Sequence, residues 1–497
     1  MEINLTPSEL VQLGSRFGIS VNSADAEILC QDVIDNIQNL EDPYLTPTLP
    51  PTATENRSWQ PPQKDPYNAI AISCIVPPSH QGTLSNLKVG VKDAISVAGI
   101  PMRAGSEIFS NFIPNSDATL VTRLLSSGAT ITAKTTLDEL AASPRSTTSV
   151  DGPILNPHDP TRVAGGSSGG SAIATATGVV DIAIGTDTGG SVRGPASFCG
   201  VLGIKPTYGL ISLNGVVENT YTLDHVGIFS KTVENMALCL DAIAGKDEKD
   251  PASMQAAGKD DYKFGGYMES LQNQPPVDQI TFGLLEEGFG EGVNTEIESQ
   301  TRETVDNLSN AGASIKSISM PKLAEHKALK DHISYAETAV HWRARGAPYR
   351  KGGSSDPFYQ STFTHRAQEK DFKLGHYYKS KLLTGCYLLD ENNGQSYTHS
   401  QAARSQFTTN FENSMSDVDV LITPTMVGLP PRVEDASNPG FDTGRNTRIA
   451  NLTGLPAISI PNGKIDGLSI GIQLIGKSFD EAKLLCYANT IQNFTSK

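Results

Sequence analysis

Apolar residues recur at helical spacing through the first forty positions of the chain. Residues 6–17 begin with the letters TPSE, a capping box with proline at the first helical position. A second run, from about Ser23 to Leu40, carries an apolar stripe with members three and four residues apart. Residues 43–66 contain seven prolines and predict a linker. The pattern therefore predicts an N-terminal helical extension with its linker over residues 1–64.

Short β-like runs then alternate with helix-like runs from about residue 69 to residue 245, which predicts an α/β sheet covered by helices. Residues 322–411 are rich in aromatic and charged residues and predict an inserted helical cap. Together these segments predict one main domain over residues 65–497. The β-like runs are 87–91, 130–133, 181–184, 418–422, 457–460 and 468–475, and the helix-like runs are 118–127, 171–178 and 233–244.

Composition narrows the class of protein. The 497 residues carry a net charge of -15, and an acidic surface repels nucleic acid and anionic membranes. The first residues lack the basic and apolar regions of a signal peptide, and no long apolar run predicts a membrane span. The six cysteines lie far apart without a C-x-x-C pair. We expect a cytoplasmic protein with reduced cysteines that binds neither nucleic acid nor membrane.

The stretch AGGSSGGSAIATATGVVDIAIGTDTGGSVRGP, residues 164–195, contains most of the candidate chemistry. Its apolar flanks argue against a flexible glycine-serine linker. Ser167 lies in a G-x-S-x-G pattern that could be a hydrolase elbow with His225 as base, but residues 154–162 contain two prolines where a strand is required. Two D-T-G tripeptides, at Asp187 and Asp442, could supply paired carboxylates, but the second has a turn-like context. Cys199 lies in an apolar segment, which favours packing over catalysis.

A third interpretation treats the stretch as one device. A glycine turn, a helix and a strand lead to a second glycine turn that ends in Ser191. Tight glycine turns can point several N–H groups into one cavity, which predicts an oxyanion hole. Lys92, at the end of a β-like run, could act as the base if it were neutral. The predicted oxyanion donors are Thr188, Gly189, Gly190 and Ser191.

These residues resemble the amidase signature family. The resemblance rests on GGSSGGS at 165–171, GTDTGGSVR at 185–193 and GIKPTYG at 203–209, and it continues upstream through Lys92-Asp93 and downstream through residues 223–227. It covers at least residues 85–232 strongly and the C-terminal part more weakly. The resemblance implies an α/β/α fold with a mixed central sheet covered by helices.

The resemblance also implies a catalytic triad of serine, cis-serine and lysine. In this triad Ser191 is the nucleophile, Ser167 is the bridging serine with a cis peptide bond, and Lys92 is the final base. It further implies an ion pair between Asp187 and Arg193 that braces the loop, and supporting hydrogen bonds from Ser168. No histidine–carboxylate cluster or P-loop accompanies the glycines, so we expect no cofactor and no metal.

The expected activity is hydrolysis of a carboxamide C–N bond through a serine acyl-enzyme. An aryl acylamidase, an esterase or a carbamate hydrolase on the same triad is an alternative, because Ser143-Pro144-Arg145 and Gly194 depart from the family pattern near the expected pocket. A glutaminase subunit of an amidotransferase and a non-catalytic binding relative are further alternatives. The N-terminal extension and the segment Leu383-Thr384-Gly385-Cys386-Tyr387 resemble stand-alone enantioselective amidases of nitrile metabolism. By that resemblance we expect a homodimer acting on a small-molecule amide.

Overall fold

The computed structural model describes residues 5–22, 24–38, 54–257, 262–320, 323–347, 357–369, 373–392 and 394–495. Part of the predicted proline-rich linker, residues 43–53, lies outside the described residues. The chain divides into two compact units, Met1–Pro51 and Thr52–Lys497. No helix among the described residues combines the length and the hydrophobicity that a bilayer crossing requires.

In the described residues of the first unit there are two helices, α1 (Pro7–Arg16) and α2 (Ala26–Gln38). The hydroxyl of Thr6 accepts from the backbone N–H of Glu9, and the Glu9 carboxylate accepts from the N–H of Thr6. The capping box of the sequence therefore closes the start of α1, because each side chain satisfies a donor that the first turn leaves free.

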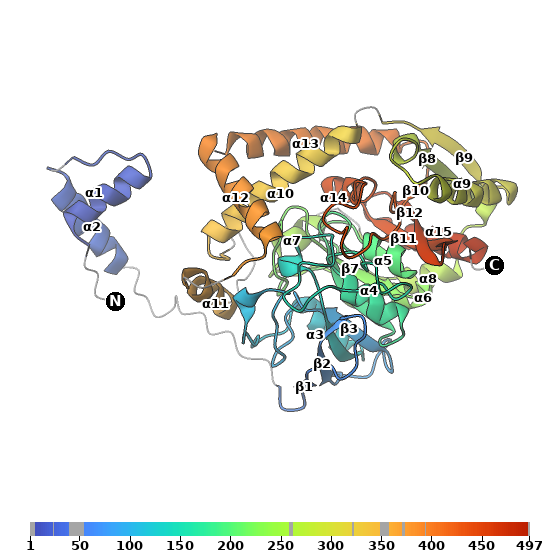
Figure 1. The fold of residues 1–497 in the computed structure, drawn as a ribbon, viewed down its shortest axis with the longest axis horizontal. Helices are drawn as coiled ribbons and strands as arrows, with labels where there is room; N and C mark the ends of the chain where they lie inside the picture. The colour runs from blue at the N-terminus through green and yellow to red at the C-terminus, as the bar shows by residue number, and fades with distance from the viewer. Residues whose placement is uncertain are drawn as a thin grey trace. The chain divides into compact units, whose positions relative to one another are not determined.

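The second unit is built around one mixed sheet, which in the described residues has 12 strands in the order β1-β2-β4-β3-β5-β7-β6-β11-β12-β10-β8-β9 (Figure 1). β3 runs parallel to β4 and β5, while β5 and β6 are antiparallel to β7. The strands are β1 (Ser58–Gln60), β2 (Ile70–Val76), β3 (Lys88–Lys92), β4 (Thr130–Thr135), β5 (Ile182–Asp187), β6 (Leu202–Lys205), β7 (His225–Ser230), β8 (Thr281–Leu285), β9 (Ser314–Ile318), β10 (Val420–Pro424), β11 (Ala457–Ile465) and β12 (Leu468–Ile475).

Helices cover both faces of this sheet. Alternation along β5 shows the two layers: Ile182 and Ile184 pack in a cluster with α3, α6 and α15, whereas Ala183 packs with α4 and α5. The expected α/β/α architecture with a mixed, helix-covered sheet is confirmed. The helices are α3 (Thr119–Ser126), α4 (Gly169–Ala176), α5 (Arg193–Cys199), α6 (Val233–Ile243), α7 (Pro251–Ala257), α8 (Tyr267–Gln272), α9 (Thr295–Asn310), α14 (Arg448–Thr453) and α15 (Glu481–Thr495).

The described residues of the segment expected to form a cap include four long helices. They are α10 (His326–Arg343), α11 (Pro357–Gln368), α12 (His376–Glu391) and α13 (Gln395–Ser414). α10 packs along both α12 and α13, and the three lie together in Figure 1. α10 and α12 contribute lining residues to the cavity that contains the candidate nucleophile.

Candidate active site

Lys92 lies at the end of β3, beside Thr135 of β4, and its side chain is fully buried. Its ammonium nitrogen Nζ lies 2.7 Å from Ser167 Oγ, 2.8 Å from Ser168 Oγ and 2.7 Å from Thr186 Oγ1. The end of β3, the end of β5 and the start of α4 therefore bring together a lysine and three hydroxyl groups.

The direction of these hydrogen bonds follows from the second partner of Ser168. Its hydroxyl donates to the carbonyl oxygen of Thr186 at 3.1 Å, so it can only accept from Lys92. The peptide bond between Gly166 and Ser167 is cis, and the carbonyl oxygen of Ser167 accepts from the backbone N–H of Asp138 at 3.2 Å. Ser168 thus holds the amine while Ser167 faces it with a hydroxyl that has no second acceptor among the described residues.

Burial lowers the pKa of Lys92 to about 7, against the opposing effect of the carboxylates of Asp138, Asp187 and Asp224. Burial also raises the pKa of Asp138, to about 6. A large fraction of Lys92 is therefore neutral near pH 7. A neutral amine has a lone pair that can accept the proton of Ser167.

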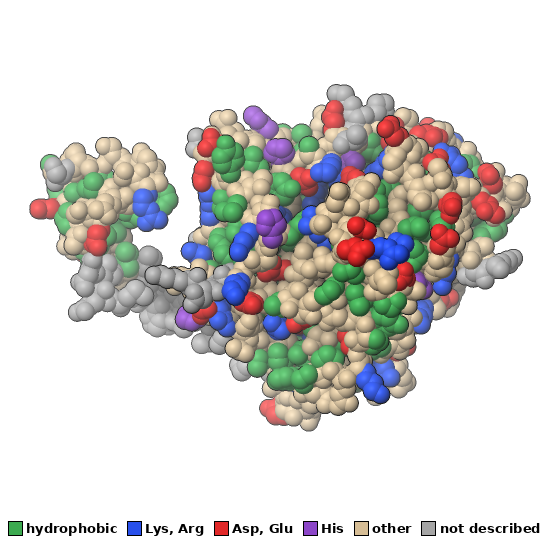
Figure 2. Space-filling model, in the orientation of Figure 1, with side chains coloured by type: hydrophobic (Ala, Val, Ile, Leu, Met, Phe, Trp, Pro, Cys, Tyr) green, Lys and Arg blue, Asp and Glu red, His purple; other side chains and the backbone are tan. Residues whose placement is uncertain are grey.

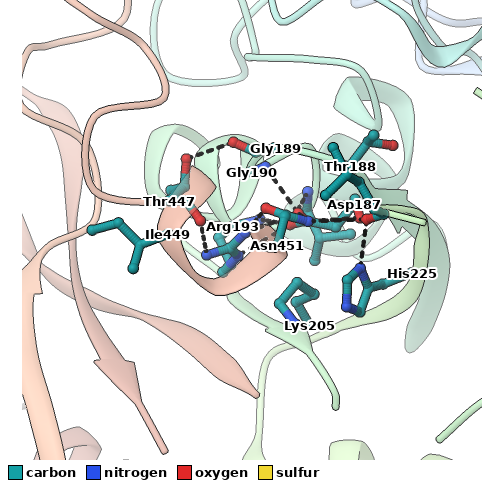
Figure 3. Close-up of polar contacts among 12 residues, drawn as sticks. Asp187, Thr188, Gly189, Gly190, Arg193, Lys205, His225, Thr447, Ile449 and Asn451 are labelled. Carbon is teal, nitrogen blue, oxygen red and sulfur yellow. Dashed lines mark hydrogen bonds and ion pairs between the residues drawn. The ribbon is translucent and has the colours of Figure 1, made fainter. Parts of the chain in front are cut away.

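The loop after β5 is held by the buried ion pair between Asp187 and Arg193 (Figure 3). Arg193 Nη2 lies 2.9 Å from Asp187 Oδ1, and both side chains are fully buried. Burial raises the pKa of Asp187, but Arg193 and Asn451 lower it more, so this carboxylate stays ionised. Asn451 Nδ2 and Arg193 Nη1 extend the network to α14, where Nη1 donates to the carbonyl oxygen of Thr447 at 2.6 Å.

The structure corrects one predicted oxyanion donor. The N–H of Gly190 donates to Asp187 Oδ1 at 2.8 Å and is not available to a substrate. Within the described part of the chain, the N–H groups of Thr188, Gly189 and Ser191 have no hydrogen-bond acceptor. Because Asp187 draws one N–H of the loop inward, the neighbouring N–H groups are left for an oxyanion.

Ser191 is half-buried and lines a cavity of about 410 Å³ beneath α10 and α12. Its hydroxyl makes no hydrogen bond to any described residue. Ser191 Oγ and Ser167 Oγ are therefore not hydrogen-bonded to each other in this structure. The backbone carbonyl of Ser191 accepts from the N–H of Ser168 at 3.2 Å, which keeps the two segments together. Arg145 and Gly194, where the sequence departs from the family pattern, also line this cavity.

Three other candidate groups do not join the cluster around Lys92. His225 is buried, its Nδ1 lies 2.7 Å from the carbonyl oxygen of Leu223, and burial holds its pKa well below the usual range. Cys199 is buried, and burial raises the pKa of its thiol. Asp442 of the second D-T-G tripeptide forms an ion pair with Arg448 instead of meeting Asp187. These three groups are structural.

Sequence reasoning missed three groups of the site. Thr186 lies within the glycine-rich stretch and a search for hydroxyls near the strand end could have found it. Asp138 lies in an ordinary polar context, and Asn451 comes 264 residues after Asp187. No local signal identifies these last two, because only the fold brings them to the loop.

The comparisons with known proteins identify the family and the fold. The sequence model of the family described as Amidase matches residues 77–485. The crystal structure of the A subunit of glutamyl-tRNA(Gln) amidotransferase from Thermotoga maritima has a TM-score of 0.71 and 28% identity, covering 86% of this chain and 87% of that chain. The native peptide amidase from Stenotrophomonas maltophilia has a TM-score of 0.68 and 26% identity, covering 84% of each chain.

Curated relatives correct the expected assembly. The A subunit of glutamyl-tRNA(Gln) amidotransferase from Halobacterium salinarum is 36% identical over 430 residues, covering 86% of this chain and 99% of the relative. The protein of the same name from Natronomonas pharaonis is 38% identical over 429 residues, covering 84% of this chain and 98% of the relative. These names describe one subunit of a larger enzyme, so the homodimer expected from stand-alone nitrile-pathway amidases is wrong. The chain belongs to the amidase signature family of hydrolases, enzymes that act on amides.

Proposed function

We propose that this chain hydrolyses a carboxamide C–N bond through an acyl-enzyme on Ser191. The observation that carries the proposal is the fully buried Lys92, whose Nζ lies 2.7 Å from Ser167 Oγ and whose pKa burial lowers to about 7. A buried neutral amine beside a serine hydroxyl is the arrangement that nucleophilic catalysis without histidine requires.

In the proposed first step Ser191 Oγ attacks the amide carbon, and its proton passes through the hydroxyl of Ser167 to Lys92. The N–H groups of Thr188, Gly189 and Ser191 stabilise the oxyanion. The protonated Lys92 then returns the proton through Ser167 to the leaving nitrogen, the C–N bond breaks, and ammonia or an amine departs. A water molecule repeats the sequence on the acyl-enzyme and releases the acid.

The experiment is labelling with a fluorophosphonate probe followed by mapping of the adduct. We expect the adduct on Ser191, none in Ser191→Ala, and labelling slowed by about 10² to 10⁴ in Lys92→Met. Lys88→Met is the matched control, because Lys88 is an exposed lysine at the other end of β3. An adduct on Ser167, or equal labelling rates in Lys92→Met and in the unaltered protein, would contradict the proposal.

A second candidate rests on the curated relatives, which are named as A subunits of an amidotransferase and are 36% and 38% identical. In this function the amide is glutamine, and the ammonia serves an amidotransferase reaction on glutamyl-tRNA with partner subunits. Release of ammonia from L-glutamine separates the two candidates. Rapid hydrolysis of small amides by the chain alone, with glutamine inert, favours the stand-alone amidase; aryl amides, esters and carbamates in the same assay test the remaining alternatives.

A further inference from the structure

The cavity around Ser191 differs in charge from the rest of the molecule. Although the chain has a net charge of -15, the cavity lining contains five cationic side chains and two carboxylates. Figure 2 shows Lys and Arg side chains gathered around the hollow beneath the cap helices. The cationic lining residues are Arg145, Lys327, Lys330, Lys381 and Arg448, and the acidic ones are Asp331 and Asp442.

The two carboxylates neutralise only part of this positive charge. Asp442 forms an ion pair with Arg448. Asp331 lies 3.0 Å from Lys327 and 3.6 Å from Lys330, so it holds Lys327 more closely. Among the described residues Lys381 forms no ion pair, and its Nζ donates to the amide oxygen of Asn219 at 2.5 Å. Lys330 and Lys381, which we call the cap lysines, are therefore left with unused capacity for an anion.

The cap lysines lie beside the loop that carries the nucleophile. Lys330 comes from α10, and a Cβ atom at Gly189 would lie 3.8 Å from its Nζ. Lys381 comes from α12 and contacts Asn219, whose Nδ2 lies 3.4 Å from the hydroxyl of Thr188. Both cations therefore line the cavity that contains Ser191, beside the loop that carries it.

Burial and mutual repulsion both disfavour the charged forms of the cap lysines. Burial first, and then the charge of Lys330, lower the pKa of Lys381 to about 7, while Asp224, Asp331 and Glu337 oppose the shift. Burial also lowers the pKa of Lys330, although Asp331 lies beside it. Lys381 is buried and Lys330 is half-buried, so an anion bound by both would offset their desolvation and their mutual repulsion.

We propose that the substrate is an amide whose acyl part ends in a carboxylate, and that Lys330 and Lys381 bind this carboxylate while Ser191 attacks the amide. The inference rests on the proposed function and names its substrate class: monoamides of short dicarboxylic acids. Hydrolysis of such a monoamide by one water molecule gives the dicarboxylate and an ammonium ion.

The test compares succinamate with 4-oxopentanamide, in which a methyl ketone replaces the carboxylate at similar size. We expect kcat/KM for succinamate to exceed that for 4-oxopentanamide by about tenfold or more, since charge-assisted hydrogen bonds are stronger than neutral ones. In Lys330→Met and in Lys381→Met this ratio should fall by about tenfold. Lys379→Met, an exposed lysine on the same helix as Lys381, should leave the ratio unchanged.

A second measurement does not depend on turnover. Succinate should protect Ser191 from the fluorophosphonate probe, and the concentration for half protection should rise about tenfold in either variant. Equal kcat/KM for the two amides, or variants that lower both values while keeping their ratio, would overturn the inference and leave the proposed function standing. Hydrolysis of neither amide, together with an unlabelled Ser191, would overturn both.

Discussion

At the residue scale, the site depends on where single protons and N–H groups are held. Ser168 can only accept from Lys92, because its own hydroxyl donates to the carbonyl oxygen of Thr186. The carboxylate of Asp187 accepts from the N–H groups of Gly190 and Val192 at 2.8 and 3.0 Å. Ser168 therefore orients the amine of Lys92, and Asp187 determines which N–H groups of the loop remain available to a substrate.

The state of Lys92 predicts the pH dependence of the reaction. The protonated amine cannot accept a proton, so kcat/KM should be low at acidic pH, rise through an apparent pKa of about 7, and level off above it. A pH profile measured with 4-oxopentanamide checks this. Lys381 also has a pKa of about 7, so Lys381→Met is the control, and the rise should persist in this variant. A rise that disappears in Lys381→Met would assign the apparent pKa to Lys381 instead.

The buried ion pair predicts a loss of stability. Asp187→Asn leaves Arg193 buried without its counter-charge, so the free energy of unfolding should fall by about 3–5 kcal/mol, with activity lost as the loop moves. Denaturant unfolding measures the change. Asp159→Asn removes the carboxylate of a partly exposed pair with Arg162 and should change stability much less than Asp187→Asn does. Equal losses in both variants would contradict the bracing role.

The position of Gly190 has no room for a side chain, which predicts that only glycine is tolerated there. Its φ is +126°, and a Cβ atom there would meet the hydroxyl of Thr447. Gly190→Ala should lower stability by about 1–3 kcal/mol and lower kcat/KM, because the loop with Ser191 must shift. Gly467 has a φ of +81° and open space around it, so Gly467→Ala should keep kcat/KM. Loss of activity in both variants would point to backbone strain alone.

At the element scale, three segments carry the chemistry: the ends of β3 and β5 and the start of α4. β3 and β5 are parallel neighbours, so their carboxyl ends meet at one edge of the sheet, where Lys92 and Thr186 lie side by side. β5 is buried along its whole length between helix layers on both faces. A substitution that shifts β5 should therefore also shift the loop that carries Ser191.

Packing of β5 predicts the stability of the sheet. Ile184→Ala removes a fully buried side chain and should lower the free energy of unfolding by about 2–5 kcal/mol. Val179→Ala, at a position 49% exposed just before β5, should change it by about 0.5 kcal/mol or less. Denaturant unfolding compares the two variants. A loss below about 1 kcal/mol in Ile184→Ala would show that this part of the core repacks.

At the scale of the whole molecule, the two compact units differ in their share of the chemistry. The unit Thr52–Lys497 contains every residue of the candidate site and the whole of the family match at residues 77–485. The unit Met1–Pro51 contains none of them.

This division predicts the result of a truncation. A chain of residues 52–497 should fold, label at Ser191 and hydrolyse amides within about threefold of the full chain, because burial within the larger unit supplies its stability. Circular dichroism and the labelling assay check this. A truncated chain that folds but fails to label would give the N-terminal unit a part in the active site.

The sequence by itself determined the local features: the capping box of α1, the strands β3, β4, β5, β10, β11 and β12, the glycine loops and the family motifs that mark Lys92, Ser167 and Ser191. Each of these depends on neighbouring residues or on a short periodic pattern, so the chain carries it without knowledge of the fold. The roles of the three marked residues stay predictions until the labelling experiment is done, as does the expected cytoplasmic location.

Only the tertiary structure decided which groups complete the site. Asn451 and Thr447 reach the loop from α14, Lys330 and Lys381 reach the cavity from the cap, and the N–H of Gly190 is withdrawn by Asp187. The physical reason is that burial, charge coupling and hydrogen-bond competition depend on distances between segments far apart in the chain. A pattern of nearby residues contains no information about those distances.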